Sequence, residues 1–269
     1  KQGVDDWAKA FESAGFKNAI RGEYAPTSEE DPDWSPEDVR YSVIRYIATD
    51  IQNAQGPHVH DPRSGEILES DILWYHNIMN LLRNWYFIHT AAINPEAQGV
   101  RFDDAVMGQL IRFVAAHEVG HTLGLPHNMG SSVAYPVDSL RSPTFTSTHG
   151  TAPSIMDYAR FNYIAQPGDG VTSFFPQIGE YDNWSIEFGY KLLGKEVTAA
   201  EEEAEIDKWI IAKAGQPQFH FGRQQGLPTD PTAQTEDLGD DAMNASNLGI
   251  ENLKRINDKL LEWATEDGE

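Results

Sequence analysis

The stretch HEVGHTLGLPH, residues 117–127, decides the fold expected for this chain. Its first five residues place two histidines four positions apart. On an α-helix, residues at that spacing lie one turn above each other on the same face. His117 and His121 can therefore point two imidazoles at one metal ion. Glu118 lies one step round the helix, where its carboxylate can reach a water molecule beside the ion without binding the ion itself.

A third ligand is predicted from the residues that follow. A catalytic zinc usually takes three ligands from the protein, and Gly124 and His127 extend the pattern to H-x-x-G-x-x-H. Gly124 can adopt a positive φ that turns the chain out of the helix, and Pro126 keeps it from resuming a helix. His127 can then approach the same ion from a loop. The alternative for H-E-x-x-H alone is a helix that happens to carry two histidines.

Composition limits the classes of function. The 269 residues are 40% hydrophobic and 11% aromatic, which is enough for one large domain, alone or with a smaller appendage. The net charge of −22 argues against binding to nucleic acid or to anionic membrane surfaces. The chain has no cysteine, which excludes disulfides, thiolate zinc ligands and a cysteine nucleophile. No apolar run reaches the roughly 18 residues of a membrane helix. A signal peptide is not visible, and one could have been removed or lie upstream.

The hydrophobic pattern predicts several helices and two strands. Besides the motif helix, which Asp103 or Asp104 can cap, helices are expected over residues 4–14, 76–92, 181–193, 198–214 and 248–264. Strands are expected over residues 39–48 and 66–75, and the turn residues DPRSG at 61–65 indicate a hairpin. Residues 128–178 show little periodicity and are expected to be irregular, which in a compact domain usually marks a functional region.

The extended motif resembles the signature H-E-x-x-H-x-x-G-x-x-H of metzincins, a group of zinc metallopeptidases. Metzincins also carry a methionine turn, and SIMDY at 154–158 is similar to it. The resemblance implies that Met156 forms an apolar floor under the three imidazoles without binding the ion, and ordinary core packing is the alternative. It also implies that Tyr158 contacts the zinc and stabilises the oxyanion, as in astacin-like and serralysin-like members. A buried tyrosine that packs the turn is an equal alternative. Asn128 matches neither the Glu of astacins nor the Pro of serralysins at that position.

A closer resemblance covers most of the chain. The segments WAKAFESAGFKNAI (7–20), DPRSGEILESDILW (61–74), HEVGHTLGLPHNMGSS (117–132) and SIMDYARFNYIAQPGDG (154–170) are similar to the catalytic domain of large exported bacterial zinc-dependent metalloproteases. This implies a bacterial, exported protein (periplasmic, cell-surface or secreted) that acts on a peptide or protein substrate. In that group a sheet strand precedes the first helix. The chain is therefore expected to lack that strand and to have one strand fewer than a complete metzincin sheet.

The resemblance implies an α/β (α+β) fold, with a twisted mixed sheet over the H-E-x-x-H helix and a mostly helical C-terminal part. Residues 1–195 are expected to form the metzincin-like catalytic domain, and residues 196–269 a helical extension packed on it. The strand 66–75 is expected at the sheet edge above the cleft, where it pairs with an extended peptide. The expected activity is that of a zinc-dependent endopeptidase, which hydrolyses peptide bonds with a zinc-bound water that Glu118 activates.

Two other functions stay open at this point. One is a catalytically silent zinc-containing domain that binds peptide or glycan, although the presence of Glu118 argues against it. The other is an interaction scaffold that uses the acidic helices and holds no metal. No G-x-S-x-G and no glycine-rich phosphate loop is present, so a serine hydrolase and a nucleotide site have no support. The oligomeric state cannot be predicted from the sequence.

Two further groups of side chains could bind metal. His58 and His60 alternate before the predicted turn, but a solvent-facing strand end is the simpler interpretation. The acidic stretch 230–241 could bind calcium through carboxylate oxygens, yet it lacks the spacing of an EF-hand loop. Capping and solvation are therefore the better interpretation of those carboxylates.

Overall fold

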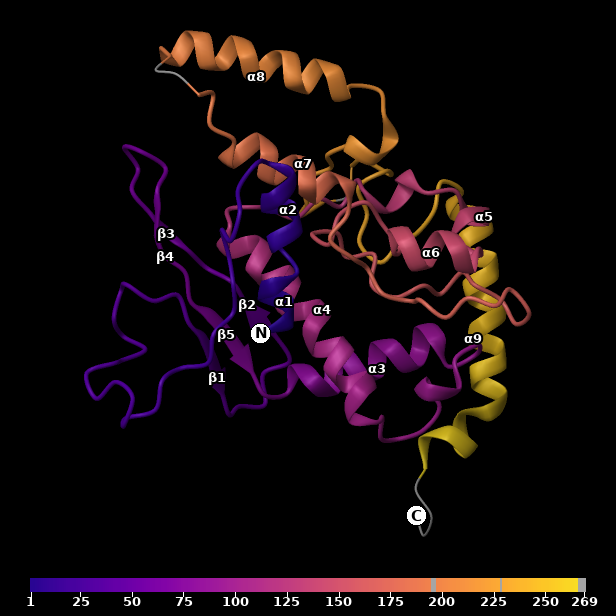
Figure 1. Cartoon of the computed structure of the whole chain (residues 1–269). Coiled ribbons are helices and arrows are strands. Elements are labelled where there is room, and N and C mark those ends of the chain that lie inside the picture. Colours follow the sequence, from indigo (N-terminus) through magenta and orange to yellow (C-terminus); the bar gives the residue numbers. More distant parts are fainter. Residues whose placement is uncertain (195–196, 228, 266–269) are drawn as a thin grey trace.

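A computed structural model describes residues 1–194, 197–227 and 229–265. Helix α4 (Asp104–Thr122) crosses the centre of the molecule, with a small sheet on one side and helices on the other (Figure 1). Buried Leu110 and Phe113 belong to the main hydrophobic core, to which the N-terminal and central helices and the sheet all contribute. Asp103 occupies the N-cap position of α4, although its side chain makes no capping hydrogen bond.

The sheet is small and mixed. It has the strand order β1 (Ile44–Ile47), β5 (Ile72–Tyr75) and β2 (Ala54–Gln55). Strand β1 runs parallel to β5, whereas β2 runs antiparallel to it. Along β5, Ile72 and Trp74 are buried and alternate with half-buried neighbours, as expected for a strand with one face on the core. The predicted mixed α/β fold is confirmed, although β1 is shorter than the predicted strand 39–48.

The prediction that residues 66–75 form one strand at the sheet edge is wrong. The stretch divides into β4 (Ile67–Glu69) and β5, and β5 is the central strand. The break falls at Ser70 and Asp71, whose side chains form hydrogen bonds with residues outside the two strands. Ser70 Oγ donates to the Thr122 carbonyl at 3.2 Å, and Asp71 Oδ1 accepts from the Val43 N–H at 2.9 Å. Strands β1 and β2 therefore form the two edges of this sheet.

The hairpin predicted from the turn residues is confirmed. Strand β4 pairs antiparallel with β3 (Val59–His60), and residues 61–66 connect them. The Asp61 N–H donates to the Glu66 carbonyl at 2.9 Å, and Gly65 has a φ of 77°. Only a residue that tolerates positive φ suits that position, and glycine does so without strain.

The N-terminal stretch predicted as one helix over residues 4–14 forms two, α1 (Gln2–Asp5) and α2 (Ala8–Ser13). Between them, Trp7 is fully buried and its indole N–H donates to the Ala116 carbonyl of α4 at 2.8 Å. Asp6 accepts both hydrogen bonds of a bidentate pair with Arg112, at 2.6 and 2.7 Å. The helix is interrupted because these two residues both turn toward α4.

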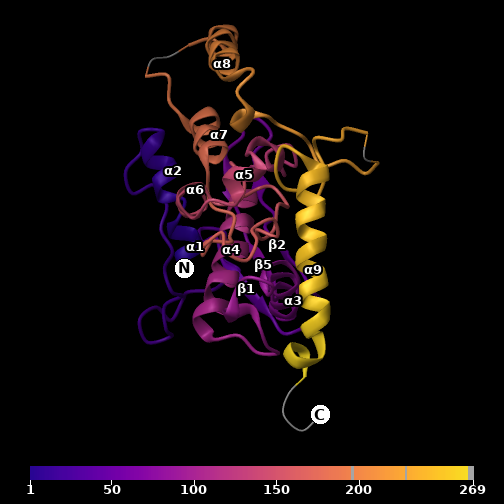
Figure 2. The same ribbon diagram turned by 90° about the vertical axis from the view of Figure 1, so that its right-hand side faces the viewer.

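The other helices lie where the periodicity placed them, with shifted ends. They are α3 (Ile78–Thr90), α7 (Glu180–Tyr190), α8 (Ala199–Lys213) and α9 (Ala242–Ala264). Helix α9 begins before the predicted residue 248, because the Asp241 side chain accepts from the N–H groups of Met243 and Asn244 and caps the helix there. It lies along the side of the molecule next to α3, whereas α8 stands apart at one end (Figures 1 and 2).

The region predicted as irregular contains short helical segments. They are η2 (Ser132–Ala134), α5 (Val137–Leu140) and α6 (Pro143–His149), and the 3₁₀ turns η1 (Pro95–Ala97) and η3 (Pro217–Phe219) lie outside it. Such short helices leave no periodic pattern to detect. Within the described residues, no helix is both long and apolar enough to cross a membrane. The predicted domain boundary at 195/196 lies outside the described residues.

Candidate metal centre

Three histidines converge at the C-terminal end of α4. His117 and His121 come from the helix. Gly124, with a φ of 89°, turns the chain so that His127 returns from the following loop. The Nε2 atom of His127 lies 3.2 Å from that of His117 and 3.0 Å from that of His121. One ligand atom from each histidine lies within 4.8 Å of the others. The structure thus brings together the three predicted ligands.

The spacing of these nitrogens fits a single tetrahedral zinc ion. Zn–N bonds of roughly 2.0–2.1 Å at tetrahedral angles separate two ligand nitrogens by about 3.3 Å. The two separations from His127 Nε2, 3.2 and 3.0 Å, are close to that value, and the three ligand atoms all lie within 4.8 Å of one another. Three protein ligands also leave one tetrahedral position open, which is typical of catalytic zinc and not of structural sites.

The opposite nitrogen of each ring fixes the tautomer. The Nδ1 atoms of His117 and His121 lie 2.7 and 2.9 Å from the carbonyl oxygens of Ile155 and Leu125. Because a carbonyl only accepts, each Nδ1 must carry the proton, and the Nε2 lone pair is left for a metal. His127 makes the corresponding contact with a side chain, that of Gln224, at 2.7 Å.

Burial keeps the three rings neutral. Desolvation, the largest effect, lowers the pKa of His117 well below its usual value, and the neighbouring His121 lowers it further. Desolvation likewise lowers the pKa of His121, and that of His127 to about 4. Metal binding requires the unprotonated imidazole. At neutral pH the site is therefore ready to accept a cation without first releasing protons.

Glu118 lies on the same helix but is not part of the histidine cluster. Its side chain is buried, and desolvation raises its pKa to about 7, against the opposing effect of a hydrogen bond from the Gly56 backbone. Gly56 follows edge strand β2. A Cβ on Gly56 would overlap the Glu118 carbonyl oxygen and lie 3.2 Å from His121 Cβ. Glycine at this position lets the sheet edge lie directly against the metal-binding turn of α4.

Met156 packs against the part of α4 that carries the helical ligands. It is fully buried, and a Cβ placed on Gly120 would overlap its sulfur. The same Cβ would lie 3.0 Å from the Trp7 ring. Gly120 belongs to the helical turn between His117 and His121, so the thioether and the indole together fill the space under that turn. This packing is compatible both with an apolar floor under the imidazoles and with ordinary core packing.

Tyr158 lies against the cluster. Its ring centroid is 4.4 Å from that of His127 and 5.6 Å from that of His117. Arg160 stacks on the ring, with its Cζ 4.0 Å from the centroid. Burial, the largest effect, raises the pKa of Tyr158, so the phenol stays protonated at neutral pH. This position is compatible with both alternatives considered for the tyrosine.

The other candidate metal ligands have structural partners. His58 Nδ1 lies 3.2 Å from the His121 carbonyl, so it can cap the end of α4, and His60 is exposed on β3. Within the acidic stretch 230–241, Asp230 accepts from Thr232 and Asp240 accepts from the Val137 N–H. These hydrogen bonds stabilise a turn and the beginning of a helix.

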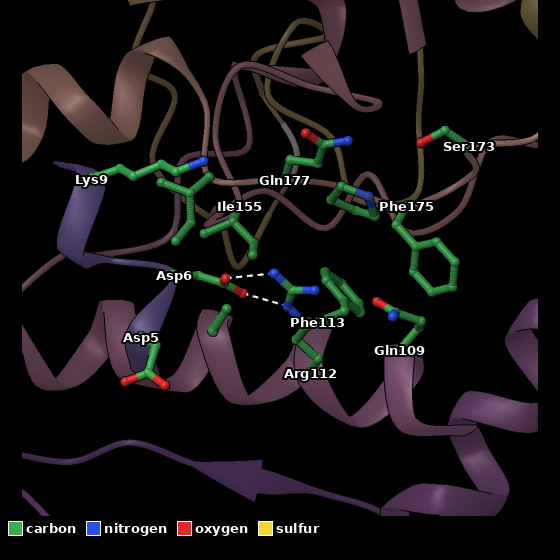
Figure 3. Close-up of a pocket in the computed structure, with 13 residues that line it drawn as sticks. Asp5, Asp6, Lys9, Gln109, Arg112, Phe113, Ile155, Ser173, Phe175 and Gln177 are labelled. Carbon is green, nitrogen blue, oxygen red and sulfur yellow. Dashed lines mark hydrogen bonds and ion pairs between the residues drawn. The ribbon is translucent and has the colours of Figure 1, made fainter. Parts of the chain in front are cut away.

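A separate cavity of about 430 Å³ lies on another face of α4 (Figure 3). The paired side chains of Asp6 and Arg112 line it, together with Phe113, Phe175 and Lys9, and none of the three histidines does. Ile155 also lines the cavity, and its backbone carbonyl accepts the proton of His117 Nδ1.

Three residues at the centre were missed by sequence reasoning. Gly56 lies more than 60 positions from Glu118, which it contacts, and Gln224 lies 97 positions from His127, so no local pattern connects them to the motif. Gly120 lies within H-E-V-G-H, where the pattern allows any residue. Its importance comes only from the methionine packed against it.

The model of a family described as Met-zincin matches residues 99–269, which is more than half of the chain. The match includes the whole of α4, the three histidines, Met156 and the segment that carries Gln224. No curated protein and no solved structure matches the chain.

Proposed function

Because this chain belongs to the Met-zincin family, we propose that it is a zinc-dependent endopeptidase in which Glu118 is the general base. The observation that carries the proposal is the convergence of three histidine Nε2 atoms, together with a buried carboxylate on the helix that provides two of those histidines. His117, His121 and His127 would hold the ion as neutral ligands. Zinc, when bound, supplies the Lewis acidity that polarises a peptide carbonyl.

Glu118 would move the protons of the reaction. A general base works best when its pKa lies near the working pH, and burial raises the pKa of this carboxyl to about 7. Glu118 accepts a proton from the attacking water and then delivers it to the amine that leaves. Tyr158 would donate a hydrogen bond to the oxyanion, and its protonated phenol and the packing of its ring against His127 support this role.

The free edge of β2 is the proposed docking line for the substrate backbone. Among the described strands, β2 pairs with β5 alone, so its outer N–H and C=O groups are available to an extended peptide. The strand ends next to Gly56, which contacts Glu118. A peptide added to this edge would pass beside the catalytic carboxylate. We further propose, from the resemblance of the sequence, that the protein is exported and that its substrates are peptides or proteins.

The test separates metal binding from chemistry. Purified protein is loaded with zinc, its metal content is measured, and a peptide library is digested with and without chelator. Glu118→Gln should retain the zinc and lose about 10²–10⁴-fold in kcat, the usual contribution of a general base. His121→Ala should lose both. Glu203→Gln on the remote helix α8 is the matched control and should leave both unchanged.

Two results would contradict the proposal. Full activity of Glu118→Gln would remove the carboxyl from the mechanism. Stoichiometric zinc without cleavage of any library peptide would favour a silent domain that binds peptide or glycan.

A further inference from the structure

The three histidines differ in what holds their outer nitrogens. The acceptor for His117 is the carbonyl of Ile155 in the methionine turn, and the acceptor for His121 is the carbonyl of Leu125 within the motif. For His127 it is the side chain of Gln224, 97 residues further along the chain. This contact is the one of the three that a substitution can remove without disturbing the backbone.

A short segment, residues 220–224, brings Gln224 to the site, and we name it the strap. Asn128, the residue directly after the third ligand, holds it at two points. Its Nδ2 donates to the His220 carbonyl at 3.0 Å, and its Oδ1 accepts from the Gly222 N–H at 2.9 Å. The Met129 N–H donates to the Gly222 carbonyl at 2.7 Å. Asn128 is fully buried, so these bonds are shielded from water.

Two glycines allow the strap to approach this closely. A Cβ on Gly130 would lie 2.7 Å from the Gly222 nitrogen, and a Cβ on Gly222 would lie 2.9 Å from the Gly130 Cα. Both separations are shorter than van der Waals contact, so a side chain at either position would push the strap away. The strap is therefore placed by packing and by hydrogen bonds against the residues that follow His127.

We propose that Gln224 is a positioning residue for the third metal ligand, and that the strap makes the C-terminal part of the chain a component of the metal centre. The inference rests on the proposed zinc site. The amide oxygen accepts the proton of His127 Nδ1, which leaves the Nε2 lone pair free and holds the ring toward the other two histidines. His127 comes from a loop, so its orientation is less constrained by its own backbone than that of the helical ligands.

Zinc affinity is the first measurement. Gln224→Leu keeps a similar side-chain length and removes the acceptor. Competition with a chromophoric chelator should show zinc binding 10–100-fold weaker than in the original protein, the usual effect of removing a partner of a metal-bound histidine. Gln224→Glu keeps an acceptor and should bind zinc at least as tightly as the original. Gln216→Leu, which removes the amide that donates to Ala212 in α8, is the matched control and should change nothing.

The tautomer of His127 is the second measurement and needs no metal. In metal-free protein, the ring ¹⁵N shifts should show the proton on Nδ1 of His127. In Gln224→Leu they should show a mixture of both tautomers, while His117 and His121 stay unchanged. A purely structural role of the strap would not produce this selective change.

The outcomes separate this inference from the proposed function. If the original protein fails to bind zinc, the proposed function falls, and the ring shifts alone decide whether Gln224 fixes His127. If the original binds zinc and Gln224→Leu binds it equally tightly, only the role of Gln224 is overturned. The role of Gln224 is also overturned if Gln224→Glu loses as much zinc affinity as Gln224→Leu, because a hydrogen-bond acceptor at position 224 would then have no effect.

Discussion

The sulfur of Met156 packs against Gly120, in the turn of α4 that separates the two helical histidines. This apolar contact joins the methionine turn to the metal-binding helix, in addition to the hydrogen bond from His117 Nδ1 to the Ile155 carbonyl. It explains why the residue between the ligands must be small, although the motif itself leaves that position open. The indole of Trp7, which belongs to the N-terminal segment of the chain, packs into the same space.

Gly120→Ala should therefore destabilise the protein, although alanine is the better helix former. The new methyl group would overlap the sulfur of Met156, and overpacking of this kind costs about 1–3 kcal/mol. Gly108→Ala in the same helix is the matched control. Apart from the adjacent residues and the backbone of its own helix, no described atom lies within 4 Å of its Cβ position, so this substitution should be neutral or should stabilise by up to about 1 kcal/mol. Urea denaturation of both variants gives the comparison, and equal stabilities would contradict the packing argument.

Gly56→Ala should reduce both stability and peptide cleavage. Its Cβ would overlap the Glu118 carbonyl oxygen, which is fixed backbone, so the strand edge must move away from α4. The hydrogen bond to the Glu118 carboxyl would be lost with that movement. Gly226→Ala serves as the control, because among the described residues no atom beyond the adjacent residues lies within 4 Å of its Cβ position. Thermal melts and kcat/KM measure the two effects, and normal cleavage by Gly56→Ala would show that the edge does not guide the substrate.

Tyr158→Phe distinguishes the two roles considered for the tyrosine. Phenylalanine keeps the ring against His127, whose centroid lies 4.4 Å away, so zinc affinity should be unchanged. Loss of one hydrogen-bond donor to an oxyanion lowers kcat by about 10²–10³-fold. We expect a decrease of that size with little change in KM. An unaltered kcat would mean that Tyr158 only packs the turn.

His89 should make the protein less stable in acid. Burial, followed by the charge of Arg160, lowers its pKa in the folded chain to about 4, and its Nδ1 has no hydrogen-bond partner. The unfolded chain, with a histidine pKa near 6.5, binds more protons between those two values. His89 therefore leaves the free energy of unfolding unchanged above pH 6.5 and lowers it progressively as the pH drops toward 4.

His89→Leu removes this contribution. Relative to the original protein, the variant should gain up to about 3 kcal/mol of stability between pH 7.5 and pH 4. Urea unfolding is measured at both values with chelator present, so that the metal ligands titrate equally in the two proteins. Parallel pH dependences of the two proteins would show that His89 does not stay neutral in the fold.

Local spacing was enough to predict the arrangement of the three histidines. The i, i+4 geometry of a helix places His117 and His121 on one face whatever surrounds them. Gly124 has the positive φ expected of it, and the chain turns at that residue so that His127 returns. Helices α3, α7 and α8 were also located by their periodicity, because an apolar stripe at 3.6-residue spacing is a property of the segment itself.

Contacts between distant segments were decided only by the tertiary structure. Residues 66–75 look like one strand by composition. The chain nevertheless breaks at Ser70 and Asp71, because those side chains bond to Thr122 and Val43, which no local pattern reveals. The same applies to the overlap of Met156 with Gly120 and to the arrival of Gln224 at His127. Ligand spacing within one helix and turn is set by backbone geometry, whereas the residues that support those ligands are brought there by packing across the whole chain.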